Sequence, residues 1–412
     1  MATTAYGDTD YNALFKQHYF KLADNVYSTF SNLYSQVPKT FTFGGNTGEN
    51  PVGVTFGGSV GSGTLPTARS RKYIKPTYTR SKVYGVLDLD NETIMASMGA
   101  DAFLKATEEQ TLGVIKSFNR NMARIFMNDG TGILGEFNGN AAGTAADPII
   151  TIINTVSDTY GFVPANWEVG DYVNVNSLAS VFEVVSYVES TGVVTLSRVS
   201  GSDNLAAIGA GDHQVYMQNS KDADPTGALD MLGGTIHGVT AQKRWQASAN
   251  INAAGAGISP DFINQLVEDI DTESDSAPTV IGASPLQYRK YLNLLEDAKR
   301  YPQGTKVAAR GNARTSSSAM AKANIGFPGI QYISTQGVIP LMKNKFIRPN
   351  AVWAFNMNEI EAAHAAKFGW FDKDGSVLHM REATDAYFAR YGGFMEIKWN
   401  PMHVGRIHSL AT

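Results

Sequence analysis

The sequence predicts an α+β fold, because segments with a helical period and segments with a strand period occupy different parts of the chain. Residues 101–127 place apolar side chains at three- and four-residue steps, as one face of a long helix requires. Residues 147–218 instead contain short runs rich in β-branched residues, separated by turn signals. After Asp222 both patterns occur in turn. With 412 residues, the chain is long enough for two or three folding units.

The composition excludes several classes of protein. The chain has no cysteine, which excludes disulfides, cysteine nucleophiles, thiolate zinc sites and cysteine-bound iron–sulfur clusters. Its 38 acidic and 34 basic residues give a net charge of −4, whereas a dedicated nucleic-acid-binding domain is usually strongly basic. Only 17% of the residues are charged, and 40 are glycine. This composition suits a surface that another molecule covers, although an enzyme of low charge would share it.

No targeting or membrane segment is recognisable. The first eleven residues lack a basic stretch followed by an apolar one, so no signal peptide is expected. No run of about 18 apolar residues occurs, so a membrane-spanning helix is not expected either. The expectation is a soluble chain, made in a cytoplasm and making no membrane contact.

The first predicted helix covers residues 10–34. Its apolar and aromatic side chains recur at three- and four-residue steps and include Tyr11, Phe15, Leu22 and Phe30. A stripe so rich in aromatic residues needs a surface to lie on. That surface is either the core of the same chain or a neighbouring subunit, and the four side chains are the candidate contacts of this arm.

A segment without a hydrophobic core follows the first helix. Residues 43–66 are rich in glycine, serine and threonine, and residues 68–82 carry basic residues with no acid among them. The basic residues are Arg69, Arg71, Lys72, Lys75, Arg80 and Lys82. Connections beyond about 12–15 residues are uncommon unless they are functional or disordered. The segment is therefore either a disordered arm or a long hairpin whose partner lies elsewhere.

The basic residues of this segment are compatible with different partners. They could contact nucleic-acid phosphates, with Tyr73 and Tyr78 stacking on bases. They could instead pair with an acidic surface, such as residues 88–92 or 268–275, of a neighbouring subunit. We favour pairing between subunits, because the basic residues lie in the segment that lacks a core. A solvated hairpin face is the third alternative.

The remaining elements follow in order. The helix over 101–127 would span about 40 Å at 1.5 Å per residue, and Asp129-Gly130 is expected to end it. The strand-rich segment reads as a small β-barrel or sandwich, with a turn at 189–192. Serine followed by proline predicts helix starts at Ser259 and Ser284. Predicted strands are 148–152, 172–175, 181–188, 193–199, 279–281, 330–333, 351–355, 394–399 and 403–408, and a further helix is predicted over 359–367.

Motifs that would indicate catalysis or ligand binding are weak. Residues Gly57–Gly61 match the nucleophile elbow of α/β hydrolases, and residues 130–135 match the dinucleotide-binding glycine pattern. Neither has the required strand before it and helix after it. Glu361 and His364 have the spacing of half a di-iron motif, and residues 372–375 resemble part of a calcium loop. The expectation is no catalytic residue, no cofactor, no metal and no enzymatic activity.

The order of these parts resembles that of tailed-phage (Caudoviricetes) major capsid proteins of the Hong Kong 97 type. The shared order is an amino-terminal helical arm, a long basic two-stranded loop, a long helix, a mixed region and long carboxy-terminal strands. Local stretches are also similar to that family, namely Thr279–Pro285, Gly326–Ile330, Gly337–Pro340, Val352–Phe355 and Arg390–Trp399.

The resemblance implies a division of the chain into named parts. These are an N-terminal arm (1–40), an E-loop (41–90), the spine helix of a peripheral domain (91–140), an inserted small β domain (141–222), an axial domain (223–370) and C-terminal peripheral-domain strands (371–412).

The resemblance also implies a function. The chain would be a structural subunit that assembles with itself, as hexamers and pentamers, into an icosahedral head shell enclosing double-stranded phage DNA. Further partners would be a separate scaffolding protein, a portal, decoration proteins and packaged DNA bound without sequence specificity. The shell would assemble in the host bacterial cytoplasm and form the virion capsid. The alternatives are an encapsulin-like nanocompartment shell protein and a serine hydrolase that uses the Gly57–Gly61 elbow.

Overall fold

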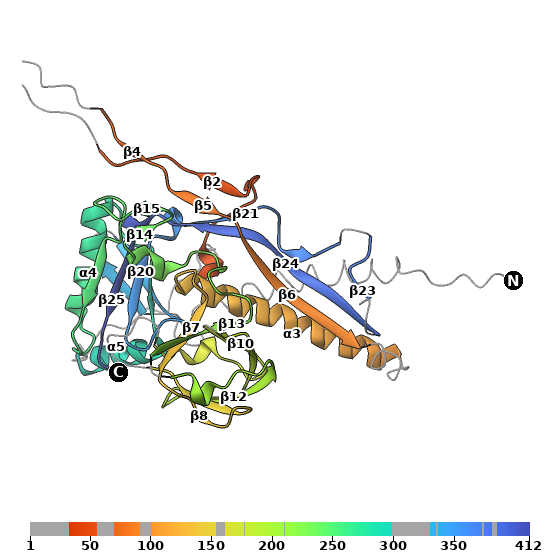
Figure 1. The fold of residues 1–412 in the computed structure, drawn as a ribbon. Helices are drawn as coiled ribbons and strands as arrows, with labels where there is room; N and C mark the ends of the chain where they lie inside the picture. Colours follow the sequence, from red (N-terminus) through yellow and green to blue (C-terminus); the bar gives the residue numbers. More distant parts are fainter. Residues whose placement is uncertain are drawn as a thin grey trace, which may run out of the picture.

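Three larger β-sheets organise the part of the chain that the structure describes (Figure 1). Two of them have six strands and one has seven, and the longest helix lies among them. The predicted mixture of helices and strands is therefore confirmed. The computed structural model describes residues 33–55, 70–90, 100–153, 161–176, 178–209, 211–298, 330–334, 337–372, 375–380 and 385–412.

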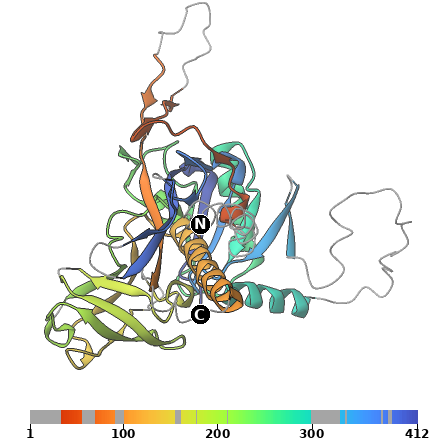
Figure 2. The same cartoon turned by 90° about the vertical axis from the view of Figure 1, so that its right-hand side faces the viewer.

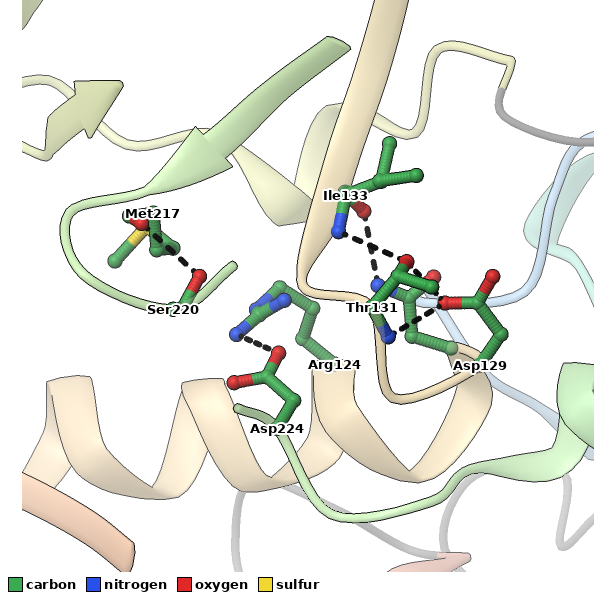
Figure 3. A network of polar contacts seen from close by, with 8 residues as sticks. Arg124, Asp129, Thr131, Ile133, Met217, Ser220 and Asp224 are labelled. Atoms are coloured by element: carbon green, nitrogen blue, oxygen red, sulfur yellow. Dashed lines mark hydrogen bonds and ion pairs between the residues drawn. The ribbon is translucent and has the colours of Figure 1, made fainter. Parts of the chain in front are cut away.

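Helix α3 (Ala100–Met127) confirms the long predicted helix. Its buried face includes Phe126, which is completely enclosed. The helix ends where the sequence predicts, because Gly130 adopts a φ of +89°, a conformation that favours glycine. Immediately beyond it, the Asp129 carboxylate accepts a hydrogen bond from the Thr131 backbone N–H at 3.0 Å, and this contact fixes the turn (Figure 3).

The sheet beside α3 is built on β24 (Ala386–Lys398), and β6 (Ser81–Asp90) pairs with it antiparallel over ten residue pairs. Phe118 of α3 packs edge-on against Phe368 and Tyr391, with ring centroids 5.0 and 5.1 Å apart, so the helix covers one face of this sheet. The remaining strands of the sheet are β21 (Glu361–His364), β22 (Gly369–Trp370), β23 (His379–Met380) and β1 (Lys39–Thr40), the last parallel to β21.

Residues 359–367 differ from the prediction of a helix. The structure has the 3₁₀ turn η6 (Met357–Glu359) and then strand β21. Ala362, Ala363 and His364 are all buried, and β1 and β24 pair with β21 on its two sides. This pairing satisfies the backbone groups and overrides the helix propensity of alanine, which is only a weak preference.

The seven-stranded sheet is an antiparallel unit with its own core (Figure 2). Phe137, Trp167 and Phe182 are among its buried residues. The Ile153 backbone N–H donates to the Glu136 carbonyl at 2.7 Å, which brings opposite parts of the sheet together as in a small barrel. In the order of pairing, its strands are β7 (Ile133–Asn138), β13 (Asp212–Met217), β10 (Tyr172–Val175), β11 (Val181–Val188), β12 (Val193–Ser200), β9 (Pro148–Thr151) and β8 (Ala142–Gly143).

The third sheet is mixed and packs against two helices, α4 (Pro260–Ser274) and α5 (Pro285–Ala298). Both helices start where predicted. The Ser259 hydroxyl accepts from the Phe262 N–H at 3.3 Å, and the Ser284 hydroxyl accepts from the Gln287 N–H at 3.2 Å. In the order of pairing, its strands are β16 (Ala249–Asn252), β25 (Val404–His408), β20 (Val352–Phe355), β17 (Val280–Ala283), β19 (Gly337–Lys343) and β18 (Ile330–Ser334).

The sheets cross two of the boundaries expected from the sequence. β7 lies within 91–140 but pairs with β13 of the seven-stranded sheet. β25 lies within 371–412 but pairs with β16 and β20, whereas β21 and β22, within 223–370, pair with β24. Each of these strands joins its sheet by pairing with segments that are distant in the sequence, and the pattern within one strand does not identify its partner.

Shorter elements complete the described residues. They are η1 (Tyr34–Gln36), β2 (Thr47–Glu49), β3 (Val52–Gly53), β4 (Tyr73–Ile74), β5 (Thr77–Thr79), η2 (Pro164–Asn166), η3 (Leu205–Ala207), η4 (Ala228–Leu232), β14 (Thr235–Ile236), β15 (Val239–Thr240) and η7 (Pro401–His403). Across the described ranges, none of the helices has the length and apolar character needed to cross a membrane.

Candidate assembly interface

Residues 41–55 and 70–80 form the two sides of an antiparallel hairpin that projects from the rest of the molecule (Figures 1 and 2). β2 pairs with β5, and β3 pairs with β4. The Val54 backbone N–H continues the ladder by donating to the Lys72 carbonyl at 2.9 Å. Of the two interpretations that the sequence left open, the described residues of this segment support the hairpin.

Very little of the hairpin is buried. Among its described residues, only Phe43, Pro76 and Tyr78 are buried, and Tyr73 is 57% exposed. A two-stranded hairpin is marginally stable in water, because it has no second layer on which to bury side chains. Val52 and Ile74 are partly buried against the main core of the same protomer, and most of the other described side chains of the hairpin are exposed.

The basic residues of this segment lie along the hairpin and just past its base. Arg71, Lys72, Lys75 and Lys82 are exposed, and the Arg80 guanidinium lies over the Phe394 ring at 5.1 Å. Lys75 Nζ is 3.9 Å from a carboxylate oxygen of Glu49, but both side chains are more than half exposed, so this pair contributes little to stability. Arg69 lies outside the described residues. Positive charge thus dominates the described surface of the hairpin.

A small apolar cluster anchors the hairpin at its base. Phe43 and Tyr78 pack with Ala363 of β21. The ring centroids of Tyr78 and His237 are 4.4 Å apart, and the Thr77 N–H donates to the His237 carbonyl at 2.9 Å. These contacts fix the direction in which the hairpin leaves the molecule.

The carboxyl group of Glu396 is buried beneath this anchor, where the residue is 2% exposed. It accepts hydrogen bonds from the Thr226 backbone N–H at 2.9 Å and from the hydroxyl of Ser81, the first residue of β6, at 3.4 Å. Burial raises the pKa of Glu396 to about 7, against the lowering effect of these hydrogen bonds. Burial, together with the charges of Glu361 and Glu396, raises the pKa of Tyr78 to about 12. Glu396 therefore changes its protonation state near neutral pH.

The ionisable groups around the anchor do not form a metal site. Burial lowers the pKa values of His237 and His364 to about 4, so both are neutral at pH 7. Glu361 contacts the Thr40 hydroxyl and lies 3.4 Å from Lys398 Nζ. Because Glu361 and His364 lie on a strand, they do not share a helix face as the di-iron spacing would require. No group of three potential ligands occurs in the described ranges.

The structure describes some of the remaining motif residues and candidate contacts, and others lie outside the described residues. The glycine pattern at 130–135 lies between α3 and β7, the reverse of the strand-then-helix order that dinucleotide binding needs. Residues 57–61 lie outside the described residues, as do 373–374 of the calcium-like stretch. The candidate arm contacts Tyr11, Phe15, Leu22 and Phe30 also lie outside them. The first described residues, Leu33 and Tyr34, are buried in the main core.

Sequence reasoning missed Glu396 and the anchoring role of Tyr78. A signal for Glu396 was present, because it is a lone acid between Phe394, Met395 and Ile397 in a predicted strand. An acid in such an apolar run is a candidate for burial with a raised pKa. No comparable local signal identifies Tyr78, whose partners lie in β21 and near β14.

The similarity of this chain to known proteins is structural. No family model and no curated protein matches it. A chain of the capsid asymmetric unit of Cyanophage A-1(L) matches with a TM-score of 0.50 and 8% identity, over 92% of this chain and 91% of that chain. A chain from Mycobacterium phage Bobi matches with a TM-score of 0.43 and 10% identity, over 92% of this chain and 90% of that chain. A chain from the holo-SrpI encapsulin complex of Synechococcus elongatus matches with a TM-score of 0.42 and 8% identity, over 91% of this chain and 85% of that chain. The chain has the fold of tailed-phage capsid proteins.

Proposed function

We propose that this chain is the major capsid protein of a tailed phage, a subunit that assembles with copies of itself into an icosahedral head shell around double-stranded DNA. The observation that carries the proposal is the projecting hairpin, which has a basic surface and only three buried residues among those described. The likeness of almost the whole chain to a cyanophage capsid chain supports it.

The physical reason for self-assembly is that the hairpin needs a partner surface. Obligate subunit interfaces bury about 2,000–5,000 Å² or more, and a two-stranded ribbon laid across a neighbour supplies area of this kind. The contact is heterologous, because the hairpin of one copy meets a different surface on the next. Repeated contacts of this type close into rings when the rotation between copies allows it, as pentamers and hexamers require.

The proposal assigns a role to each part of the chain. Residues 1–40 are an arm and 41–90 an E-loop; the hairpin of the E-loop contacts a neighbouring subunit, whereas its strand β6 and the arm strand β1 also belong to the β24 sheet. Helix α3 and the β24 sheet form the peripheral domain, the seven-stranded sheet is an inserted domain, and the β25 sheet with α4 and α5 is the axial domain. The chain is structural and has no enzymatic role. Its further partners are a scaffolding protein, a portal, decoration proteins and packaged DNA, and it assembles in the host cytoplasm before residing in the virion capsid.

The experiment that tests the proposal shortens the hairpin without disturbing its anchor. Residues 54–72 are replaced by Asn-Gly, which keeps the β2–β5 and β3–β4 pairings, the cluster of Phe43 and Tyr78, and the packing of Val52 and Ile74 on the main core. We expect the unaltered protein to form shells or capsomers in size-exclusion chromatography and negative-stain microscopy. The shortened variant should elute as a folded monomer of about the chain mass, with unchanged circular dichroism.

Two results would contradict this proposal. An unaltered protein that remains a 44.4 kDa monomer at all concentrations tested would argue against a shell subunit. Normal shells from the shortened variant would argue against the hairpin as the assembly element.

A further inference from the structure

A cluster of arginines lies away from the hairpin, where α3, the seven-stranded sheet and the β25 sheet meet. Arg124 of α3, Arg348 of the segment before β20 and Arg406 of β25 line one cavity of about 30 Å³. Asn128 and Asn166 add polar groups to the lining, and the described residues that line it include no Asp or Glu. Three cationic side chains from distant parts of the sequence thus converge on one small space.

Arg124 has hydrogen-bonding capacity that its ion pair does not use. Its side chain is 3% exposed, and its Nη2 lies 2.9 Å from Asp224 Oδ2 (Figure 3). Its Nε and Nη1 are buried and have no hydrogen-bond partner among the described residues. A buried charged donor without a partner costs more than the roughly 1–3 kcal/mol of a neutral one. These two donors therefore favour an acceptor beside them.

Arg406 adds a second positive charge to the cavity lining. Asp224 pairs with Arg124, and the hydrogen-bond partner of Arg406 is neutral. The Nε of Arg406 is 3.3 Å from Asn250 Oδ1, a neutral acceptor, and its guanidinium lies 5.6 Å from the centre of the Trp353 ring. Burial and the charge of Arg348 lower the pKa of Arg406 to about 10, which still leaves the group protonated at neutral pH. Like charges held close together in a poorly hydrated space repel, and a counter-charge between them removes that repulsion.

We infer that this cavity is a binding site for one small inorganic anion of halide size, held by Arg124, Arg348 and Arg406. The volume of the cavity limits the size of the ligand. A cavity needs about 10–15 Å³ to hold a water molecule, so a cavity of about 30 Å³ accepts a halide ion but not a phosphate ester. A water molecule would satisfy donors without supplying charge. The inference is independent of the shell function, because every residue that it uses belongs to one protomer.

The bound anion would join three separately built parts of the molecule. Arg124 comes from the helix, Arg406 from the β25 sheet, and Asn166 from the turn η2 that follows the first strands of the seven-stranded unit. Because the anion binds only when these parts are in place, it stabilises the folded protomer by mass action. Chloride is then expected to raise the melting temperature.

The test compares sodium chloride with sodium gluconate at the same ionic strength, using the full-length chain. We expect the melting temperature to rise as chloride replaces gluconate, and the ³⁵Cl NMR line to broaden in proportion to protein concentration. Arg406→Gln should lose the chloride-dependent part of both signals. Arg390→Gln is the matched control, because Arg390 is exposed on a strand and also lies over an aromatic ring, that of Phe388 at 5.1 Å; it should behave as the unaltered protein.

Three outcomes would overturn the inference. In the first, the unaltered protein has the same melting temperature in chloride and in gluconate, and the ³⁵Cl line does not broaden as the protein concentration rises. This result does not depend on whether Arg406→Gln folds. A second is the same chloride response in Arg406→Gln and Arg390→Gln. The third is a stabilisation by sulfate that is lost in Arg406→Gln but kept in Arg390→Gln, because the general stabilising effect of sulfate is the same in both variants; this would rule out a site of halide size.

Discussion

At the scale of single residues, the buried carboxyl of Glu396 joins the hairpin base to the loop that contains Thr226. Its folded-state pKa, about 7, is above the ordinary value of 4.5. The folded protein therefore keeps a proton there that the unfolded chain releases between pH 4.5 and 7. Stability that depends on this group is full below pH 4.5, falls as the pH rises to about 7, and changes little above that.

Glu396→Gln should remove this pH dependence. The amide oxygen still accepts from the Thr226 N–H, and no charge is buried at high pH. We expect the stability of Glu396→Gln relative to the unaltered protein to increase by about 3 kcal/mol between pH 4.5 and 8, a value that follows from the shift in pKa. Urea unfolding at both pH values measures it. Glu189→Gln, at an exposed turn, is the control; parallel pH profiles for the unaltered protein and Glu396→Gln would contradict the expectation.

At the scale of elements, the end of α3 is closely packed against the segment that leads into η4. A Cβ added at Gly227 would lie 2.2 Å from the carbonyl oxygens of both Ile125 and Asn128, which is far inside contact distance. These oxygens belong to backbone, so relief would require the last turn of α3 or the 227 segment to move. Glycine is required here by close approach.

Gly227→Ala should therefore lower the free energy of unfolding by about 1–3 kcal/mol, the usual cost of overpacking. The matched control is Gly234→Ala, where an added Cβ meets nothing within 4 Å. Chemical denaturation of the two variants beside the unaltered protein measures the difference. If both variants unfold at the same denaturant concentration, the proposed clash at Gly227 is wrong.

Some of these elements could be predicted from the sequence and others could not. Ser259, Ser284 and Gly130 set helix ends through contacts within a few residues, so those boundaries were predictable. β21 was not, because Ala362 and Ala363 become a strand only through pairing with β1 and β24, the latter more than twenty residues away. The memberships of β7 and β25 depend on pairing in the same way. At the candidate interface, the basic residues were visible in the sequence, whereas Tyr78 and Glu396 acquire their roles from distant partners.

At the scale of the whole molecule, the charge is unevenly distributed. Residues 41–82 contain six basic residues and one acid, so a chain of net charge −4 carries −9 outside them. If this segment docks on another copy, the rest of that copy carries the opposite net charge. Complementary charge of this kind accelerates association and is screened by salt.

Assembly should therefore slow as the salt concentration rises, and reversal of the hairpin charge should slow it further. We expect Lys72→Glu with Lys75→Glu to lower the assembly rate at low salt by at least tenfold, measured by light scattering. The control is Lys221→Glu with Lys243→Glu, which makes the same change of charge at exposed positions outside the hairpin. Equal rates for the two double variants would show that net charge alone, and not the hairpin, governs association.

The ladder between β6 and β24 has a mechanical consequence. β6 continues directly from the hairpin base and pairs with β24 over ten residues, a length of about 33 Å. A pull on the hairpin along the strand direction would load this ladder in shear, so that many hydrogen bonds resist together. A pull across the strands would instead break them one after another. The joint is therefore strongest along the axis of the hairpin, and if the hairpin docks on a neighbouring copy as proposed, tension on that contact would pass into the β24 sheet.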